Sequence, residues 1–354
     1  MSAARIPTLV LGAGGYVGGE LLRLIAAHPR FELLAAVSAS QAGKAIGSVF
    51  ASLATAFDGS TFCAPDAWPG RLPEGAELAV FSAAPHGASA NLVDDVLHTA
   101  AEKRATVHVV DSSADFRYAD AALYRTVYGQ AHAAPGLLGQ FARGVPEQVA
   151  GNDRAHAGHP GCFATAALLA AVPLCRSRLA PAALYINGIT GSTGSGREPQ
   201  SGTHHPERHS NLYAYKPLAH RHAPEIAAQL EAAGGGDVAV HFVPHSGPFA
   251  RGIHVTLQAT LPAAVNTAEL REIYEAYYKD AVFVRTIDGT PRLKDVVASN
   301  FCHIGVAAQG DSVVVLCVID NLVKGAAGGA MQWMNRLWSL PESTGLEAAA
   351  PLWT

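Results

Sequence analysis

Short apolar runs alternate with longer amphipathic segments through the first half of the chain. Four of these runs are rich in apolar and β-branched residues and predict strands, at 7–12, 31–37, 78–81 and 106–111. Segment 16–27 has apolar residues at helical spacing until His28-Pro29 ends it, and 88–104 predicts a second helix. Strands that alternate with helices predict an α/β fold with a Rossmann-type, doubly wound parallel sheet.

The second half of the chain has a different pattern. Residues 184–260 are rich in Gly, Ser and His, and segment 268–279 has helical spacing. Strand-like runs occur at 237–243, 252–258 and 312–319. These features predict a second domain of the α+β class, followed by a final helix over 325–340 that begins with small residues.

Length and charge narrow the class of protein. The chain has 354 residues, which is long enough for two domains. Apolar residues make up 49% of it and charged residues only 15%, so a largely disordered chain is excluded. The formal net charge is -4 and no basic run is longer than two residues, so no nucleic-acid partner is expected.

The sequence predicts neither a membrane span nor an export signal. The longest nearly apolar run, 164–175, is too short to cross a bilayer, and the N-terminal apolar run stops at a glycine cluster without a cleavage site. Five cysteines without a CxxC motif support neither a disulfide framework nor a zinc ribbon. We therefore expect a reducing, cytoplasmic location.

Glycines cluster between the first predicted strand and the first predicted helix. The turn reads Gly12-Ala-Gly14-Gly15-Tyr16-Val17-Gly18. Glycines at such a turn let the backbone approach a pyrophosphate, which then meets the free N–H groups of the helix N-terminus. Val17 stands where GxGxxG would place its third glycine, so the turn is a variant of that loop. We expect these glycines, Tyr16 and Val17 to bind a dinucleotide, with a tight turn that binds no ligand as the alternative.

The end of the second predicted strand favours NADP(H) over NAD. An NAD enzyme usually carries Asp or Glu there for the ribose 2′-hydroxyl. Here Val37 is followed by Ser38, Ser40 and Lys44, and no carboxylate stands among them. Two hydroxyls and an ammonium can bind a 2′-phosphate, although a merely polar loop would have the same composition.

One cysteine occupies a position suited to covalent catalysis. His159-Pro160-Gly161 breaks the chain just before Cys162, and an Ala/Leu run follows, so Cys162 is expected in the first turn of a buried helix. The unpaired N–H groups and the dipole at that position favour a thiolate, which is the nucleophile that attack on a carbonyl needs. A buried structural cysteine is the alternative, and it is the interpretation of Cys63, Cys175, Cys302 and Cys317.

Two histidines precede another predicted helix start. His220 and His222 lie just before Pro224, and either can move a proton during collapse of a thiohemiacetal. Zinc binding is an alternative role for His204-His205 and for the pair His220-x-His222. No HExxH motif or Cys/His pairing supports it, so no metal is expected.

Several further segments carry recognisable motifs. Segment 111–117 is similar to DLSADFR, 159–165 to NPGCYPT, and 220–226 to HRHTPEI. Similar matches follow at 12–21, 42–44, 144–147, 191–197, 242–253 and 321–328. In this order and over nearly the whole chain, they resemble the N-acetyl-γ-glutamyl-phosphate reductase family of arginine biosynthesis, which belongs with the aspartate-semialdehyde dehydrogenases.

The resemblance implies an NADPH-dependent oxidoreductase that converts N-acetyl-L-glutamyl 5-phosphate to the 5-semialdehyde and phosphate. It implies Cys162 as the nucleophile that forms a thioester, and His220, or alternatively His222, as the acid/base. It also implies a cofactor contact for Asn321. Since phosphate needs cationic or N–H partners, the candidate substrate-binding residues are Arg117, Ser192, Arg197 and Arg251. A structural ion pair is the alternative role for each arginine.

The same resemblance implies the architecture. Residues 1–158 would form the NADP-binding domain, with 324–354 packing back on it, and residues 159–323 the catalytic and dimerisation domain. A homodimer or homotetramer is expected, with a small acyl phosphate as substrate. The sequence leaves the oligomeric state and any regulation open.

Departures from the family pattern leave the acyl group open. His159 replaces Asn, Phe163 replaces Tyr, His303 follows Cys302 in place of Asp, and Gly329 replaces Gln. The acyl group can therefore be acetyl or a larger group such as succinyl.

Three other functions are compatible with parts of the sequence. The related reductase of lysine biosynthesis acts on a carrier-linked substrate, for which the chain lacks a basic run. Aspartate-semialdehyde dehydrogenase lacks the motifs at 220–226 and 321–328. A non-catalytic NADP sensor would need neither Cys162 nor His220.

Overall fold

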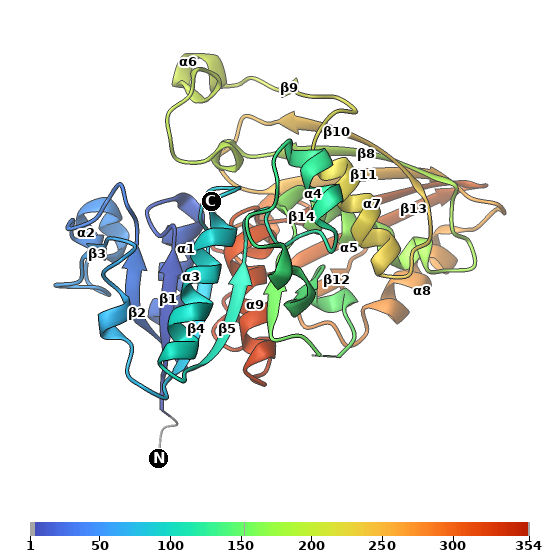
Figure 1. Cartoon of the computed structure of the whole chain (residues 1–354). Helices are drawn as coiled ribbons and strands as arrows, with labels where there is room; N and C mark the ends of the chain where they lie inside the picture. Colours follow the sequence, from blue (N-terminus) through green and yellow to red (C-terminus); the bar gives the residue numbers. More distant parts are fainter. Residues whose placement is uncertain (1–3, 152, 353–354) are drawn as a thin grey trace. The chain divides into compact units, whose positions relative to one another are not determined.

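A computed structural model describes residues 4–151 and 153–352, and its helices and strands are labelled in Figure 1. Seven strands form an all-parallel sheet in the order β3-β2-β1-β4-β5-β7-β6. Their bounds are β1 (Ile6–Leu11), β2 (Phe31–Val37), β3 (Phe62–Cys63), β4 (Glu77–Ser82), β5 (Thr106–Asp111), β6 (Phe141–Arg143) and β7 (His156–Gly158). The predicted Rossmann-type sheet is confirmed, and its switch point lies between β1 and β4, the place where such sheets bind ligands.

The helices that belong with this sheet are α1 (Tyr16–Ala27), α2 (Ile46–Val49), α3 (Ser89–Glu102), α4 (Ala121–Tyr128) and α9 (Gly328–Leu337). Helix α1 buries Leu21, Leu22 and Ile25 on one face, as its spacing predicts. Helix α9 packs against α1 and β5. His28, just after α1, shares a hydrogen bond of 3.0 Å with Asn335 of α9. The predicted final helix differs at its start, because Val323–Ala327 is a π-helical turn.

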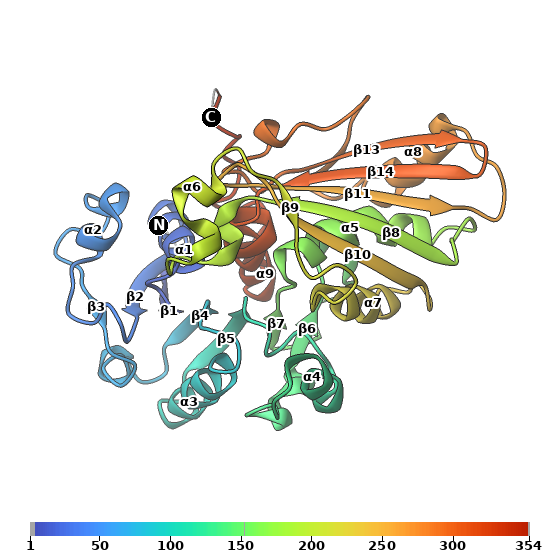
Figure 2. The same cartoon turned by 90° about the horizontal axis from the view of Figure 1, so that it is seen from above.

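The second sheet is mixed and has the order β12-β13-β14-β11-β8-β10-β9 (Figure 2). Its strands are β8 (Ala183–Thr190), β9 (Tyr213–Ala214), β10 (Ala239–Ser246), β11 (Ile253–Thr260), β12 (Val284–Thr286), β13 (Cys302–Gln309) and β14 (Ser312–Ile319). Strands β8 and β10 are parallel, whereas β11 is antiparallel to both β8 and β14. The predicted α+β class is therefore confirmed for this part of the chain.

Three helices cover one face of the second sheet in Figure 1: α5 (Cys162–Cys175), α7 (His222–Ala232) and α8 (Thr267–Tyr277). The short helix α6 (His205–Arg208) lies in the segment that leads to β9. Helix α8 begins at a capping box of Asn266 and Glu269, in which each side chain accepts a backbone N–H of the other residue. The remaining turns are 3₁₀ helices at 51–53, 69–71, 135–140, 146–148, 192–195, 201–203 and 293–295.

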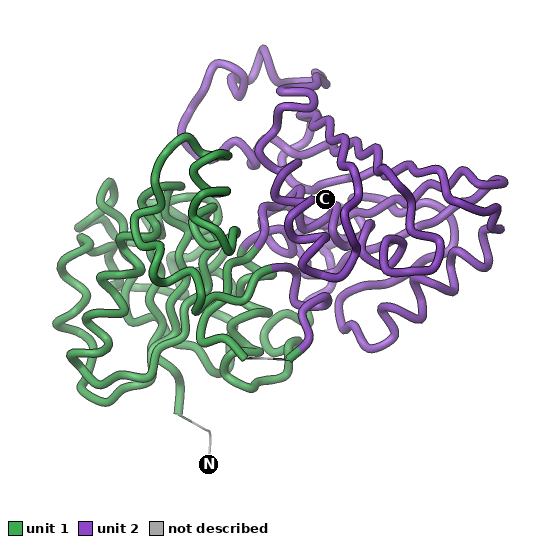
Figure 3. The backbone as a smooth tube through the Cα atoms, turned by 45° about the vertical axis from the view of Figure 1, so that its right-hand side comes forward, with its two compact units in different colours: residues 1–143, 151–159, 327–347 green, residues 144–150, 160–326, 348–354 purple. Residues whose placement is uncertain are grey.

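The chain divides into two units, coloured separately in Figure 3. The first contains residues 1–143, 151–159 and 327–347, and the second contains 144–150, 160–326 and 348–354. Residues 144–150 thus belong with the second unit, and α9 with the first. We propose that the functional domains have the limits expected from the sequence, which differ slightly from those of the two units: 1–158 with 324–354, and 159–323.

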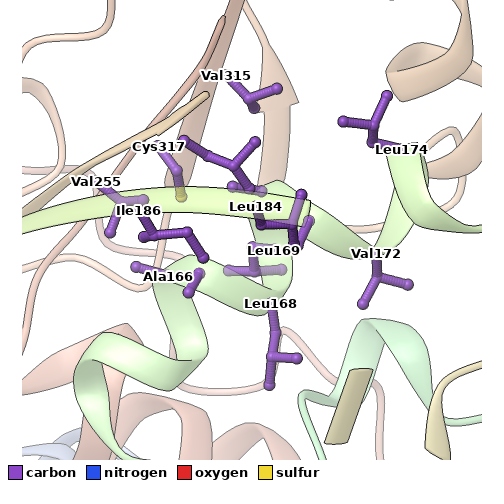
Figure 4. Packing of buried hydrophobic residues seen from close by; sticks show 14 of the residues in the cluster. Ala166, Leu168, Leu169, Val172, Leu174, Leu184, Ile186, Val255, Val315 and Cys317 are labelled. Carbon is purple, nitrogen blue, oxygen red and sulfur yellow. The ribbon is translucent and has the colours of Figure 1, made fainter. Parts of the chain in front are cut away.

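Helix α5 is the centre of the second unit's core. Every residue from Phe163 to Cys175 is buried, which explains why this segment is apolar on all sides. Figure 4 shows Leu169 of α5 beside Leu184 of β8, whereas Leu168 points away from that strand. Full burial of each leucine contributes about 1.5–3 kcal/mol of hydrophobic stabilisation. The helix that carries Cys162 at its start is therefore held firmly in place.

Candidate active site

Cys162 is the first residue of α5, as predicted. Gly161 precedes it in an extended conformation and no side chain caps the helix. The thiol is partly buried, whereas Cys63, Cys175, Cys302 and Cys317 are buried. A sulfur at this position lies at the positive end of the helix dipole, which favours a negatively charged thiolate.

A buried carboxylate organises the chain around Cys162. Glu225 is fully buried, and its Oε1 accepts the Gly161 N–H at 2.7 Å. Its Oε2 lies 3.9 Å from Nε2 of His222, one helical turn earlier on α7. The sequence analysis did not name Glu225 as a site residue, although its i,i+3 spacing from His222 places both on one helical face. Glu225 thus connects the helix start at Cys162 to one of the two candidate histidines.

His220 is held as a neutral imidazole. Its Nδ1 accepts the backbone N–H of His222 at 3.2 Å, which leaves the ring proton on Nε2. Burial, with the nearby charges of Arg221 and Lys216, lowers the pKa of His220 to about 4. Its ring centre lies 4.7 Å from that of His222 and 6.2 Å from that of Phe163, which follows Cys162.

Tyr215 and Gly325 complete the surroundings of Cys162. Burial, and then the electrostatic influence of the nearby Cys162, raises the pKa of Tyr215. Gly325 lies in the π turn, and a Cβ on it would be 2.9 Å from Cβ of Cys162. The sequence analysis treated Gly325 as part of a small-residue helix start and of the motif at 321–328, because nothing local indicates a contact with residue 162.

Arg251 forms the ion pair that the sequence analysis gave as its alternative role. Its Nε and Nη2 donate to the two carboxylate oxygens of Asp320 at 3.0 and 3.2 Å. Asp320 is fully buried and also accepts the backbone N–H groups of Ala298, Leu322 and Val323. Contact between Arg251 and a substrate stays a prediction.

Asn321 and the loop after β8 are joined within the second unit. The Asn321 Oδ1 accepts the Gly252 N–H at 2.7 Å, and its Nδ2 donates to Thr193 at 3.0 Å. Ser192 lies in this loop and is partly buried, whereas Arg197 is exposed. The structure thus brings Ser192, Asn321 and the chain next to Arg251 together and leaves Arg197 on the surface. The cofactor role of Asn321 stays a prediction.

The glycine turn of the first unit has the geometry that a pyrophosphate requires. Gly12 has φ +72°, and a Cβ on it would lie 2.5 Å from the carbonyl oxygen of Ala83. A Cβ on Gly14 would lie 2.8 Å from Oγ of Ser38, and one on Gly18 would collide with the backbone of Ala13. Helix α1 then begins at Tyr16, with Gly15 before it and no side-chain cap. The residues therefore fit a dinucleotide at this helix N-terminus.

The end of β2 suits a 2′-phosphate. Ser38 is buried beside Gly14, and Ser40 and Lys44 are exposed in the following turn. The Lys44 ammonium donates to Gln41, which holds it in the loop. The sequence analysis missed the loop 83–87, which follows β4 and contacts Gly12. This loop could have been predicted, because the segments that follow parallel strands meet at one edge of the sheet and β4 pairs with β1.

Arg117 lies in the first unit and is buried. Its Nε donates to the carbonyl oxygen of His159 at 3.1 Å, and its Nη2 to that of Ser112 at 2.9 Å. These bonds fix the chain just before Pro160, which lies two residues from Cys162. A role of Arg117 in binding substrate stays a prediction.

The described residues contain neither a metal-binding cluster nor a membrane-spanning helix. Among residues 4–151 and 153–352, no group of three or more His, Cys, Asp or Glu side chains is arranged to hold a metal ion. Within the same ranges, no helix combines the length and apolar character needed to cross a membrane.

The chain matches two protein-family descriptions. Residues 8–147 match "Semialdehyde dehydrogenase, NAD binding domain", and residues 162–321 match "Semialdehyde dehydrogenase, dimerisation domain". A protein of Methanopyrus kandleri named N-acetyl-gamma-glutamyl-phosphate reductase is 40% identical over 346 residues, covering 96% of this chain and 97% of its own. A Pseudomonas aeruginosa protein of the same name is 41% identical, covering 97% of this chain and 98% of its own.

Solved structures show the same fold at low identity. Aspartate semialdehyde dehydrogenase II of Vibrio cholerae has a TM-score of 0.67 at 15% identity, over 95% of this chain and 99% of its own. The Candida albicans aspartate semialdehyde dehydrogenase with NADP has a TM-score of 0.64 at 15% identity, over 95% of this chain and 99% of its own.

Proposed function

The chain belongs to the semialdehyde dehydrogenase family, among the N-acetyl-gamma-glutamyl-phosphate reductases, and we propose that it works through a thioester on Cys162. It is an NADPH-dependent oxidoreductase of arginine biosynthesis. It reduces N-acetyl-L-glutamyl 5-phosphate to N-acetyl-L-glutamate 5-semialdehyde and releases phosphate. The observation that carries the thioester proposal is the partly buried Cys162 at the start of a wholly buried helix, with Glu225 holding Gly161.

In the first step, the Cys162 sulfur bonds to the acyl carbon and the C–O bond to phosphate breaks. The hydrogen bond between Glu225 and Gly161, and the 3.9 Å approach of Glu225 to His222, keep the sulfur and an imidazole on adjoining elements. For the departing phosphate, Arg117, Ser192, Arg197 and Arg251 remain the proposed partners. Because the Asp320 carboxylate neutralises the charge of Arg251, we expect Arg251 mainly to fix the position of residues 320–323. We expect its charge to contribute less to phosphate binding.

NADPH supplies the hydride that reduces the thioester carbon. Gly12, Gly14 and the N-terminus of α1 would hold its pyrophosphate, and Ser38 and Lys44 its 2′-phosphate. One histidine then protonates the thiohemiacetal oxygen on Cys162 and takes the proton back as the C–S bond breaks and the aldehyde leaves.

His220 is our proposed acid/base, since its Nδ1 is occupied by a backbone N–H and its Nε2 carries the proton. The lowered pKa means that its neutral form persists below pH 6.5 and is lost only near pH 4. We therefore expect the first-turnover rate of NADPH formation from semialdehyde, without phosphate, to stay level through pH 6.5 and to decline towards pH 4.

Two asparagine variants test this assignment. His220→Asn should lower that rate about 100-fold or more, the low end of general acid–base contributions. His222→Asn is the matched comparison and should retain the acid limb near pH 4. An acid limb near pH 6.5, or one removed only by His222→Asn, contradicts the assignment to His220.

An assay of NADPH formation in the reverse direction tests the reaction and its substrate. With N-acetylglutamate semialdehyde and phosphate, the protein should form NADPH from NADP+ at least tenfold faster than NADH from NAD+ at equal concentrations. Aspartate semialdehyde and an aminoadipate-derived semialdehyde should give no comparable rate. An N-succinyl analogue tests the acyl group that the sequence left open. Turnover of aspartate semialdehyde without turnover of N-acetylglutamate semialdehyde would refute the substrate assignment.

For the partner, we propose a second copy of this chain on the uncovered face of the second sheet. Residues 162–321 match a dimerisation domain, and helices α5, α7 and α8 cover only the opposite face of its sheet (Figure 2). On the uncovered face, Tyr185 of β8 is 53% exposed and stacks on His241 of β10 at 4.8 Å between ring centres. A homodimer through this face is our first choice, and a homotetramer would add a second interface. The five free cysteines support a cytoplasmic location.

Placing a charge on this face should separate the two copies. Tyr185→Glu should weaken the dimer by at least about 2 kcal/mol, because an exposed tyrosine at an interface centre is a typical hot spot. Light scattering at micromolar concentration should then give a mass near the 36.7 kDa of one chain. Val282→Glu, at an exposed apolar position outside β8 and β10, is the matched control. An unchanged mass for Tyr185→Glu places the interface elsewhere.

A further inference from the structure

Two charged residues that the proposed reaction does not use meet in the core of the second unit. Lys324, from the segment 321–328, and Glu147, from 144–147, form an ion pair of 2.5 Å. The Lys324 side chain has no solvent exposure and the Glu147 side chain 2%. Lys324 also lies 5.6 Å from the ring centre of Phe283. Both charges are therefore removed from water.

Such a pair is a poor source of stability. Two charges lose their hydration on burial, and their attraction roughly offsets that loss. Replacement of a buried pair by apolar side chains of similar volume is often neutral or stabilising, whereas removal of one partner is strongly destabilising. A buried pair that adds little stability can still specify one arrangement of the chain, and the question is which arrangement this one specifies.

The segment that Lys324 anchors contacts the nucleophile. Lys324 is the second residue of the π turn Val323–Ala327, and Gly325 follows it directly. The space at Gly325 is so limited that a Cβ there would be 2.9 Å from Cβ of Cys162 and 3.2 Å from its Cα. Single π turns are rare and occur often at functional sites. The position of residue 324 thus decides where the chain lies against Cys162.

The other end of this segment is already fixed. The carboxylate of Asp320 accepts the N–H groups of Leu322 and Val323 at 2.7 and 2.9 Å, and its carbonyl oxygen accepts that of Gly325 at 2.9 Å. All three bonds are local, and the one from Gly325 spans five residues, as in a π turn. The contact with Glu147 is the long-range one, since it joins residues 177 positions apart.

We propose that Lys324 and Glu147 are positioning residues, which fix the π turn so that Gly325 packs against Cys162 and holds the thiol for attack. The proposal rests on Cys162 being the nucleophile of the proposed function. It predicts that the pair matters for the placement of the thiol more than for the free energy of folding.

The test compares single and double variants of the full-length protein. Lys324→Met and Glu147→Leu, made singly, should each lower the melting temperature, because each removes the opposite charge from a charge that stays buried. The double variant Lys324→Met/Glu147→Leu should melt within a few degrees of the wild type. Its kcat should nevertheless fall at least tenfold, with KM for the semialdehyde changed less than threefold. Iodoacetamide should alkylate Cys162 at least threefold faster in the double variant than in the wild type, because Gly325 no longer covers the thiol. The mass of the peptide that contains Cys162 measures this rate.

The matched control removes an ion pair that lies on the surface of the same unit. Arg271 and Glu275 of α8 are both partly exposed, so Arg271→Met/Glu275→Leu should leave kcat and the alkylation rate unchanged. Wild-type kcat and alkylation in the core double variant would overturn the proposal. So would a double variant that melts as low as the single ones, because the pair would then be a stabilising contact. Failure of the wild type to reduce the acyl phosphate would refute the proposed function, while melting and alkylation would still report on the pair.

Discussion

Cys162→Ala is expected to abolish reduction of the acyl phosphate, with kcat lowered by a factor on the order of 10⁴ or more. Without the sulfur there is no thioester to accept hydride, and direct attack on the acyl phosphate lacks the group that splits the reaction into two easier steps. Removal of the side chain from a partly buried helix start should change the melting temperature little. Steady-state turnover and circular dichroism measure the two effects.

A second cysteine on the same helix provides the control. Cys175 is the last residue of α5 and is buried, and burial raises the pKa of its thiol to about 12. Cys175→Ala should therefore keep turnover within about twofold while lowering stability by roughly 1 kcal/mol, as expected for a small buried group. In the wild type, mass spectrometry after mixing with substrate should detect an acyl adduct on the peptide that contains Cys162. Normal turnover by Cys162→Ala would rule out the thioester mechanism.

Gly325→Ala is expected to lower kcat about 100-fold, the effect of displacing a reacting group by about 1 Å. The added methyl group would lie 2.9 Å from Cβ of Cys162 and 3.3 Å from the carbonyl oxygen of Asp320. Neither neighbour is the end of a flexible side chain, so the helix start or the π turn must shift. The loss should appear in kcat, measured at saturating semialdehyde and NADP+.

Gly139→Ala is the matched control for this substitution. A Cβ on Gly139 meets nothing within 4 Å, and this residue lies in a 3₁₀ turn of the first unit. Its kcat should equal that of the wild type. If Gly325→Ala also leaves kcat unchanged, the close packing of residue 325 against the nucleophile has no role in turnover.

Local sequence patterns predicted the features that depend on neighbouring residues. The spacing of Leu21, Leu22 and Ile25 predicted α1, and the break at Pro160-Gly161 predicted a helix beginning at Cys162. The glycine turn was predicted for the same reason, since φ of +72° at Gly12 is a local requirement. The short strands β6 and β7 were missed, because three residues each are too few to show a period.

The roles of individual charged side chains could not be predicted in this way. Arg251 was a candidate phosphate ligand by type, yet it pairs with Asp320, which lies 69 positions further along the chain. Glu225 was quoted only within a motif, yet its carboxylate holds Gly161, 64 positions away. A charge pattern shows that a partner is needed, but only packing shows which partner is within reach.

The sequence by itself thus determined the two fold classes, the preference for NADP(H), the family and the helix start at Cys162, because turns, periodicity and ordered motifs are short-range properties of the chain. The tertiary structure decided what surrounds Cys162: Glu225 at Gly161, the neutral His220, Gly325 against Cys162, and the buried pair of Lys324 and Glu147. These contacts join segments far apart in sequence. They form only when strands and helices pack around α5, and local propensity carries no information about that packing.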